Sequence, residues 1–369
     1  MTIYEELGIR PIINANATLT KLGGSLMPPE VVEAMVEASW HFVDLHELQQ
    51  RVGEKLAELT RNEAAYVCCG AAAGLTLATA ACITVANPAA MAYLPVLAGL
   101  KNEVIIHKSH RNGYDHAVRA VGIRVVEIGD AAGTTEDHLK AAISDKTAAI
   151  AWFQGAMTGM GDLPIERVIA IAKSRGVPVI VDAAAQLPPV SNLWRFTQMG
   201  ADLAIFSGGK DLCGPQSSGL IVGRRDLIEA CRLNGSPNHS IGRPMKVGKE
   251  EMCGLLAAVK RYVALDHEAR AQRCEEIVAG WSEALNRVPG ITACRDFPNE
   301  AGQPIPRCMV TIDSGAARID RDSLVARLLS CSPSISVAPA GSDGIYLNPM
   351  TLEPGEPETV LRRLVELLS

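Results

Sequence analysis

The stretch Ser207-Gly-Gly-Lys-Asp-Leu-Cys-Gly-Pro-Gln-Ser-Ser-Gly-Leu-Ile-Val-Gly223 decides the fold, because it places one lysine in a loop of small residues. The apolar segments on either side, residues 201–206 and 218–223, are typical of short buried strands. Two glycines precede Lys210 and let the backbone approach a bulky planar partner closely. A partly desolvated lysine forms Schiff bases with carbonyl compounds. The alternative is an ordinary lysine in a surface loop.

A second stretch, Val177-Pro-Val-Ile-Val-Asp-Ala-Ala-Ala-Gln-Leu-Pro-Pro189, places Asp182 at the predicted carboxyl end of a strand. Ligands of open α/β sheets bind at those ends. An aspartate there can cap a helix, bind a metal or pair with a protonated ring nitrogen. Followed one strand later by Lys210, it gives the arrangement that pyridoxal 5'-phosphate (PLP) requires. The aspartate keeps the pyridinium protonated, and the lysine holds the aldehyde as an imine.

A family resemblance rests on these two motifs and on Arg10-Pro-Ile-Ile-Asn-Ala-Asn16 near the start. Together they resemble the selenocysteine synthase (L-seryl-tRNA selenium transferase)-like family of fold-type I PLP enzymes. Within it, the chain is similar to the D-glucosaminate-6-phosphate ammonia-lyase-like members. The resemblance covers residues from about Gly8 onward. It implies an α/β fold with a large domain on a mostly parallel, seven-stranded-type sheet, a smaller α+β C-terminal domain, and a homodimer or higher homo-oligomer.

Length and composition are consistent with a two-domain enzyme. The 369 residues exceed one average domain, and 48% of them are hydrophobic. We predict an N-terminal arm and helix over 1–48, a large PLP-binding domain over 49–245 and a small domain over 246–369. The net charge of -6, without a basic run, disfavours a nucleic-acid partner and favours a small-molecule substrate.

The compartment follows from what the sequence lacks. The first residues show no basic region followed by an apolar core, so we expect no signal peptide. The longest apolar run, residues 64–91, is interrupted by Asn87-Pro88 and does not predict a membrane span. Ten scattered cysteines without zinc-ligand spacing are typical of free thiols in a reducing cytosol. We therefore expect a cytoplasmic protein without a bound metal.

The cofactor phosphate has a candidate site in residues 65–74, a predicted strand that runs into a small-residue turn and a helix. Backbone N–H groups at a helix N-terminus bind phosphate, and the resemblance implies that the cofactor phosphate lies here. Gly70, Ala71 and Ala72 are the candidates, with tight helix packing as the alternative. The turn does not have the G-x-G-x-x-G pattern, which disfavours a nicotinamide cofactor.

A polar cluster follows the predicted strand 103–107 and includes His110. The resemblance implies that His110 stacks on the pyridine ring, which leaves its imidazole available for proton transfer. A metal site is the alternative, but no carboxylate has the necessary spacing. At the end of the next strand, 148–153, Gln154 or Thr158 contacts the cofactor or substrate, or forms a turn. Ser207 completes the predicted cofactor-binding set.

Four residues are candidates for binding substrate. Asn14 and Asn16 alternate with alanine in an extended arm, which the resemblance places along the substrate pocket. Arg243 lies in a loop rich in Gly, Pro, Asn and Ser (231–247) and could bind an anion across a dimer interface, or be a solvated loop arginine. A long helix is predicted over 250–285. Beyond it, Arg307 begins a strand, and the resemblance implies that it binds the substrate carboxylate with two hydrogen bonds.

The expected reaction is removal of the α-proton by Lys210, loss of a β-hydroxyl with His110 as proton donor, and release of ammonia to give a 2-keto acid. The elimination step comes from the resemblance alone. Lysine plus aspartate suits racemisation or epimerisation, transamination and retro-aldol cleavage equally well. A tRNA-linked selenium transferase and a non-catalytic PLP-binding protein remain as other classes.

Overall fold

The protein is described by a computed structural model over residues 2–85, 87–155, 158–159 and 161–368. It forms two compact units, a large one of Ser25–Leu265 and a small one of Met1–Gly24 with Asp266–Ser369. These limits differ from the predicted domain boundaries at 48/49 and 245/246. The reason is packing, because the helix that follows residue 248 lies against the two helices near the start of the large unit.

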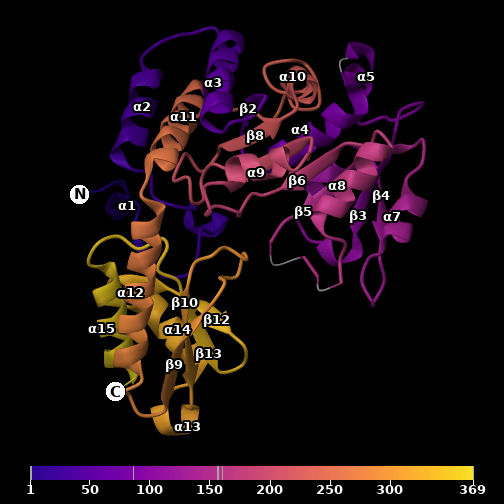
Figure 1. The fold of residues 1–369 in the computed structure, drawn as a ribbon. Coiled ribbons are helices and arrows are strands. Elements are labelled where there is room, and N and C mark those ends of the chain that lie inside the picture. Colours follow the sequence, from indigo (N-terminus) through magenta and orange to yellow (C-terminus); the bar gives the residue numbers. More distant parts are fainter. Residues whose placement is uncertain (1, 86, 156–157, 160, 369) are drawn as a thin grey trace. The chain divides into compact units, whose positions relative to one another are not determined.

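The large unit is built on a seven-stranded sheet whose strand order is β2-β8-β7-β6-β5-β3-β4. Only β8 runs antiparallel to its neighbours. This arrangement confirms the predicted α/β fold class (Figure 1). The strands are β2 Ala64–Cys68, β3 Glu103–His107, β4 Arg124–Ile128, β5 Thr147–Phe153, β6 Val179–Asp182, β7 Leu203–Ser207 and β8 Gly219–Gly223.

Both faces of this sheet are covered by apolar side chains, which is why its strands read as continuous apolar runs. In β5, Ile150 and Trp152 belong to one core, whereas Ala151 and Phe153 belong to the other. The helices are α2 Pro29–Ser39, α3 Leu45–Leu59, α4 Ala71–Thr84, α5 Pro88–Tyr93, α6 Asp115–Arg119, α7 Glu136–Ala142, α8 Ile165–Ser174, α9 Asn192–Gln198, α10 Arg225–Asn234 and α11 Lys249–Ala264, with a 3-10 turn η2 at Lys108–His110.

Helix α4 lies close to the sheet because its residues are small. It is buried along almost its whole length, and a Cβ atom on Gly74 would lie 2.8 Å from Cγ2 of Ile205 in β7. This close contact holds the N-terminus of α4 at the sheet edge. The packing alternative for the small-residue turn is therefore confirmed, and the predicted phosphate contact stays a prediction.

The small unit contains a four-stranded antiparallel sheet of order β12-β13-β10-β9. Figure 1 shows α12 and α15 beside it, and α12 contacts both β9 and β10. The predicted helix over 250–285 is wrong in one respect, because it is broken where Asp266 caps α12 by accepting a hydrogen bond from the Ala269 N–H. The elements are α12 His267–Leu285, β9 Ile291–Asp296, β10 Arg307–Ile312, α13 Ser314–Ala317, α14 Arg321–Ser330, β11 Ser334–Ser336, β12 Ala338–Ala340, β13 Gly344–Leu347 and α15 Glu356–Leu368.

The N-terminal arm is part of the small unit. It comprises α1 Ile3–Glu6, β1 Ile12–Asn14 and the 3-10 turn η1 Thr20–Leu22, and β1 pairs in parallel with β11. The guanidinium of Arg10 donates hydrogen bonds to the carbonyls of Leu329, Ser330 and Cys331, at the C-terminal end of α14. Cationic groups are stabilising at that end of a helix. The motif at residues 10–16 thus holds the arm to the small unit.

Two further findings concern the described residues only. None of their helices combines the length and apolar character needed to cross a membrane. They contain no group of three His, Cys, Asp or Glu side chains placed to hold a metal ion.

Candidate active site

The predicted cofactor residues lie along one edge of the large sheet, where β2, β7, β6, β5 and β3 all end. Pairing places Cys68 opposite Gly219 and Gly219 opposite Ser207. Asp182 in turn pairs with Ile205 on one side and with Phe153 on the other. The strand ends therefore carry four features in neighbouring positions. These are the small-residue turn at Gly70, the loop of residues 207–214 that contains Lys210 (the lysine loop), Asp182 and Gln154. Loops at this edge form the ligand sites of open α/β sheets.

Asp182 has the surroundings expected of a partner for a cationic ring nitrogen. Its carboxylate Oδ1 accepts a hydrogen bond of 3.0 Å from the Ala184 N–H. Burial raises the pKa of the Asp182 carboxyl above its ordinary value, although the Ala184 hydrogen bond and the charge of Lys210 oppose the change. A buried carboxylate gains most from a cationic partner that replaces its lost hydration.

The lysine loop requires both of its glycines. A Cβ atom on Gly208 would lie 2.0 Å from the Ser218 hydroxyl oxygen, and one on Gly209 would lie 2.7 Å from the Cα of Gln216. The Gly208 N–H donates to the Ser218 carbonyl at 2.9 Å, which closes the base of the loop. Lys210 is half-buried, and its charge opposes the rise in the pKa of the Asp182 carboxyl. The loop is thus folded back on itself with the lysine held near the aspartate.

The small-residue turn presents backbone N–H groups at the start of a helix. Gly70 precedes α4 with a φ of +122°, a conformation that favours glycine, and no side chain caps the first turn of this helix. A Cβ atom on Gly219 would lie 2.6 Å from the carbonyl carbon of Gly70 and 2.9 Å from the Ala71 nitrogen. Ala72 is exposed. Uncapped N–H groups at the start of a helix bind phosphate.

These groups fit PLP. The turn would offer N–H donors to a phosphate, Asp182 a half-buried carboxylate to the ring nitrogen, and Lys210 an amine to the aldehyde. All three come from adjacent strand ends of one sheet. The donor set contains no cluster that suits a metal ion among the described residues.

His110 is fully buried in an aromatic cluster. Its ring stacks on that of His107 with a centroid distance of 4.8 Å, and the edge of Trp152 contacts both. Its Nδ1 accepts a long hydrogen bond of 3.4 Å from the Phe153 N–H, and its Nε2 lies 3.4 Å from Oδ2 of Asp162. Burial, reinforced by His107, lowers the pKa of His110 to about 4, although Asp162 opposes the change.

The imidazole of His110 is therefore neutral at pH 7, with both nitrogens facing internal partners. This geometry argues against the prediction that it protonates a leaving hydroxyl, because a proton donor must reach the substrate oxygen. The predicted stacking on the cofactor ring needs only a ring face and stays a prediction.

Sequence reasoning missed Asp162, which holds this cluster in place. Its side chain is only 5% exposed and its Oδ2 accepts hydrogen bonds of 2.6 Å from the Ser109 hydroxyl and from the Gly159 N–H. Burial raises the pKa of Asp162, but these hydrogen bonds and the two histidines outweigh burial, so the pKa lies below its ordinary value. No local motif marks this residue, because its side-chain partners Ser109 and His110 come from a distant segment.

Gln154 lies where the sequence predicts it, at the end of β5. Its side-chain Oε1 accepts a hydrogen bond of 2.8 Å from the indole N–H of Trp152, and its backbone N–H donates to the Asp182 carbonyl at 2.9 Å. The amide NH2 is thus the group it can offer to a ligand. Thr158 is exposed, and its N–H closes a turn onto the Gly155 carbonyl.

The two arm asparagines make structural hydrogen bonds within the small unit. The Asn14 amide donates to the Ala17 carbonyl at 2.8 Å and its Oδ1 accepts from the Asn16 N–H at 3.0 Å. The Asn16 amide donates to the Val337 carbonyl at 3.1 Å. These contacts fix the arm, so their predicted contact with substrate stays a prediction that the geometry does not require.

Arg307 is engaged by its own unit. Its guanidinium contacts Asp296 at 2.5 Å and Glu300 at 3.2 Å, and it lies 3.8 Å above the ring of Tyr346. A substrate carboxylate would have to displace one of these partners, which argues against the predicted role. Arg243, by contrast, is half-buried in the loop after α10 and has no carboxylate partner among the described residues. It remains the better candidate for an anionic substrate group.

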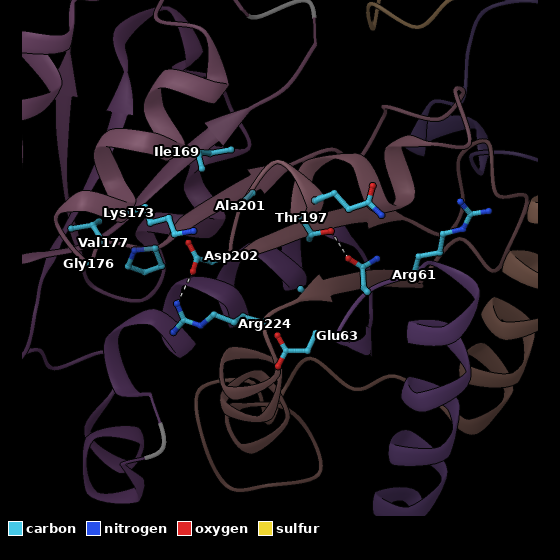
Figure 2. A pocket seen from close by; sticks show the side chains of 15 residues that line it. Arg61, Glu63, Ile169, Lys173, Gly176, Val177, Thr197, Ala201, Asp202 and Arg224 are labelled. Atoms are coloured by element: carbon cyan, nitrogen blue, oxygen red, sulfur yellow. Dashed lines mark hydrogen bonds and ion pairs between the residues drawn. The ribbon is translucent and has the colours of Figure 1, made fainter.

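A surface cavity of about 490 Å³ lies at the opposite edge of the large sheet, near the starts of β6 and β7. Figure 2 shows Asp202 and Arg224 pointing toward one another there, with their atoms 2.6 Å apart. Lys173 and Arg61 also line it. None of the candidate cofactor or substrate residues does. This cavity and the candidate chemistry therefore lie at different edges of the large sheet.

Comparison with known proteins agrees with this geometry. The model of the aminotransferase class-V family matches residues 18–242, which include the turn, Asp182 and Lys210. The chain belongs to this family. It has the fold-type I architecture of PLP-dependent enzymes, and PLP is the cofactor that the family members imply.

Two relatives match this member of the aminotransferase class-V family along almost its whole length. It is 36% identical over 374 residues to a 5'-C-glycyluridine monooxygenase-decarboxylase from Streptomyces, covering 99% of this chain and 92% of the relative. It is 32% identical over 372 residues to a D-glucosaminate-6-phosphate ammonia lyase from Salmonella typhimurium, covering 99% and 97%. The solved structure of a D-glucosaminate-6-phosphate ammonia-lyase superimposes with a TM-score of 0.88 at 31% identity, covering 100% and 98% of the two chains. The predicted resemblance is confirmed.

A more distant relative is the L-seryl-tRNA(Sec) selenium transferase of Nitratidesulfovibrio vulgaris, at 26% identity over 93% of this chain and 79% of the relative. This likeness confirms the wider family named from the sequence motifs.

Proposed function

We propose that this enzyme is a PLP-dependent lyase that removes water from a hydroxylated amino acid or amino sugar acid and then releases ammonia, giving a 2-keto acid. The observation that carries the proposal is the Lys210–Asp182 pair at the sheet edge beside the uncapped start of α4. It stands in a chain that matches an ammonia lyase over its whole length. The net charge of -6 supports a small-molecule substrate rather than tRNA.

Bound PLP supplies an aldehyde for the substrate amine and an electron-accepting ring. The N–H groups of Gly70, Ala71 and Ala72 would hold its phosphate, and Asp182 would keep its ring nitrogen protonated. Lys210 would anchor the aldehyde, exchange with the substrate amine and take the α-proton. Its ammonium group is then a proton source for the leaving β-hydroxyl, a task for which His110 is poorly arranged.

The substrate class follows from what the two relatives share. One relative is named for a glycyl group joined to uridine and the other for an amino sugar acid phosphate. Both names combine an amino acid group with a sugar. We therefore propose an amino acid that carries a hydroxylated, sugar-like body, with Arg243 as a contact for an anionic group.

A second candidate reaction is oxidative decarboxylation, and the 36% identity to a monooxygenase-decarboxylase favours it. Lys210 and Asp182 serve either reaction, because both begin by breaking a bond to the α-carbon next to an electron-accepting ring. Oxygen dependence separates them.

The test is to load the enzyme with PLP and supply a panel of amino sugar acids and β-hydroxy amino acids, with and without phosphate, in air and under argon. The lyase predicts ammonia and a 2-keto acid in equal amounts at the same rate without oxygen. Release of carbon dioxide that stops under argon would assign the oxidative reaction instead. Exchange of the α-hydrogen with solvent, without release of ammonia or carbon dioxide, would place the enzyme among the racemases or transaminases.

We also propose a cytoplasmic homo-oligomer. Ten free cysteines suit a reducing compartment. Trp40 is 77% exposed and Phe42 is fully exposed beside α2, a surface that a second copy of the chain would cover. Light scattering during gel filtration tests this; a dimer or larger species is expected, and replacing Phe42 by Ser should shift it toward monomer. A monomeric wild-type enzyme would contradict it.

A further inference from the structure

The chain crosses between the two compact units at two points, after Gly24 and after Leu265. A side chain at or near each crossing makes a hydrogen bond with the lysine loop, residues 207–214.

At the first crossing, the hydroxyl of Ser25 lies 2.6 Å from the carbonyl oxygen of Lys210 and 3.0 Å from that of Gly209. A hydroxyl donates one proton, so it is shared between these two oxygens and favours the nearer one. Gly23 and Gly24, immediately before Ser25, have φ angles of +88° and +78°. Glycine populates this region without strain, so the segment can change direction directly before the contact.

At the second crossing, the phenol of Tyr262 donates a hydrogen bond of 2.6 Å to Oδ2 of Asp211. Both side chains are buried, with 0% and 3% of their surface exposed. Tyr262 lies in the last turn of α11, and its own carbonyl accepts from the N–H of Leu265, the last residue of the large unit. A hydrogen bond to a buried charged group is among the stronger ones in proteins.

We propose that Ser25 and Tyr262 are positioning residues that couple the two crossings to the backbone of Lys210. Ser25 fixes the peptide carbonyl of Lys210 and Tyr262 fixes the next residue, so the lysine backbone is held on both sides. This inference rests on the proposed function, in which Lys210 carries the cofactor and takes the α-proton.

The test compares Ser25→Ala, Tyr262→Phe and the double variant, all loaded with PLP, with Ser25→Thr restoring the hydroxyl. The control is Ser39→Ala, because the Ser39 hydroxyl donates to the Val36 carbonyl inside α2, with no contact to the lysine loop. Hydrogen exchange of the peptide over residues 207–215 is followed with and without substrate, together with kcat and KM.

Each single variant is expected to accelerate exchange in this peptide and to lower kcat roughly three- to tenfold, with a smaller change in KM. The double variant should accelerate exchange in this peptide at least as much as either single variant does. Ser25→Thr should restore much of the wild-type behaviour, and Ser39→Ala should match wild type. Ser25 is half-buried, so its variant keeps the test valid if Tyr262→Phe does not fold.

Unchanged exchange of residues 207–215 in a folded Ser25→Ala enzyme would overturn the coupling, as would a Thr variant no better than Ala. The failure of the proposed function looks different. A wild-type protein that does not retain PLP would refute that function, whereas exchange measured on the same unloaded protein would still decide whether Ser25 and Tyr262 hold the loop.

Discussion

The carboxylate of Asp162 lies 3.4 Å from Nε2 of His110, although the two residues belong to different loops at the ends of β5 and β3. Asp162 also accepts a hydrogen bond from Ser109, the neighbour of His110. The aspartate thus ties one loop of the site to another and fixes the plane of a buried imidazole. This contact connects the aromatic cluster to the cofactor edge of the sheet.

Replacing Asp162 by Asn tests that connection. The amide keeps the size of the side chain but removes the negative charge that Ser109 and Gly159 donate to, so both hydrogen bonds weaken. We expect PLP affinity to fall roughly three- to tenfold, because the ring predicted to stack on the cofactor is less well fixed. Fluorescence titration with PLP measures this. Asp145→Asn, on an exposed loop, is the control; equal affinities in both variants would contradict the role.

The buried imidazoles predict a pH dependence of stability. Burial lowers the pKa of His110 to about 4 from an ordinary 6.5, and burial also lowers the pKa of His107. Between pH 6.5 and 4 the unfolded chain therefore binds more protons than the folded chain does. The contribution of these histidines to the free energy of unfolding is fully present above pH 6.5 and is lost as the pH falls through this window. Over this whole window, the loss from His110 is on the order of 3 kcal/mol.

Unfolding in urea at pH 7, 5.5 and 4.5 checks this expectation. His110→Gln cannot titrate, so its stability should depend less on pH between 6.5 and 4 than that of the wild type, whatever its absolute value. Parallel pH profiles for the two proteins would show that His110 is not held neutral by burial.

Asp182→Asn should reduce turnover by roughly 100-fold or more, because an amide cannot keep the ring nitrogen protonated. Lys210 should still form a borohydride-trapped adduct, which separates the loss of turnover from loss of cofactor. Asp202→Asn, at the opposite edge of the sheet, removes an ion pair with Arg224 and should leave turnover near wild type. Similar turnover in the two variants would contradict the assignment of Asp182.

Gly219→Ala should weaken both the fold and cofactor binding. Its Cβ would lie 2.6 Å from the backbone of Gly70, so the turn before α4 must shift, at a cost of about 1–3 kcal/mol. Gly280→Ala in α12 is the matched control, because its Cβ would meet no atom within 4 Å and alanine favours a helix. The first variant should melt at lower temperature and require more PLP for half-saturation. A variant equal to Gly280→Ala in both respects would be inconsistent with the close contact.

The sequence predicted those parts of the site that are encoded locally. Lys210, Asp182 and Gly70 each lie in a short motif next to an apolar strand, and the order of the strands brings the three together. Asp162 was missed because its function depends on contacts with Ser109 and His110, which only the folded chain creates. The same holds for Tyr262 and Asp211.

Other expectations failed or weakened where tertiary partners were invisible. Arg307 is at a strand start as predicted, but its pairs with Asp296 and Glu300 could not be read from its motif. The continuous helix over 250–285 was predicted from periodicity, whereas Asp266 starts a new helix within it. Domain limits were misplaced for a related reason, since α11 packs against helices more than 180 residues earlier in the chain.

The central claim is that Lys210 carries PLP, and borohydride reduction followed by peptide mass spectrometry tests it most directly. The claim predicts an absorbance band near the visible edge that disappears on reduction, with the mass of reduced PLP added to the peptide that contains Lys210. The Lys210→Ala variant should show neither the band nor turnover. A modification on another lysine, or turnover that persists in Lys210→Ala, would contradict the account.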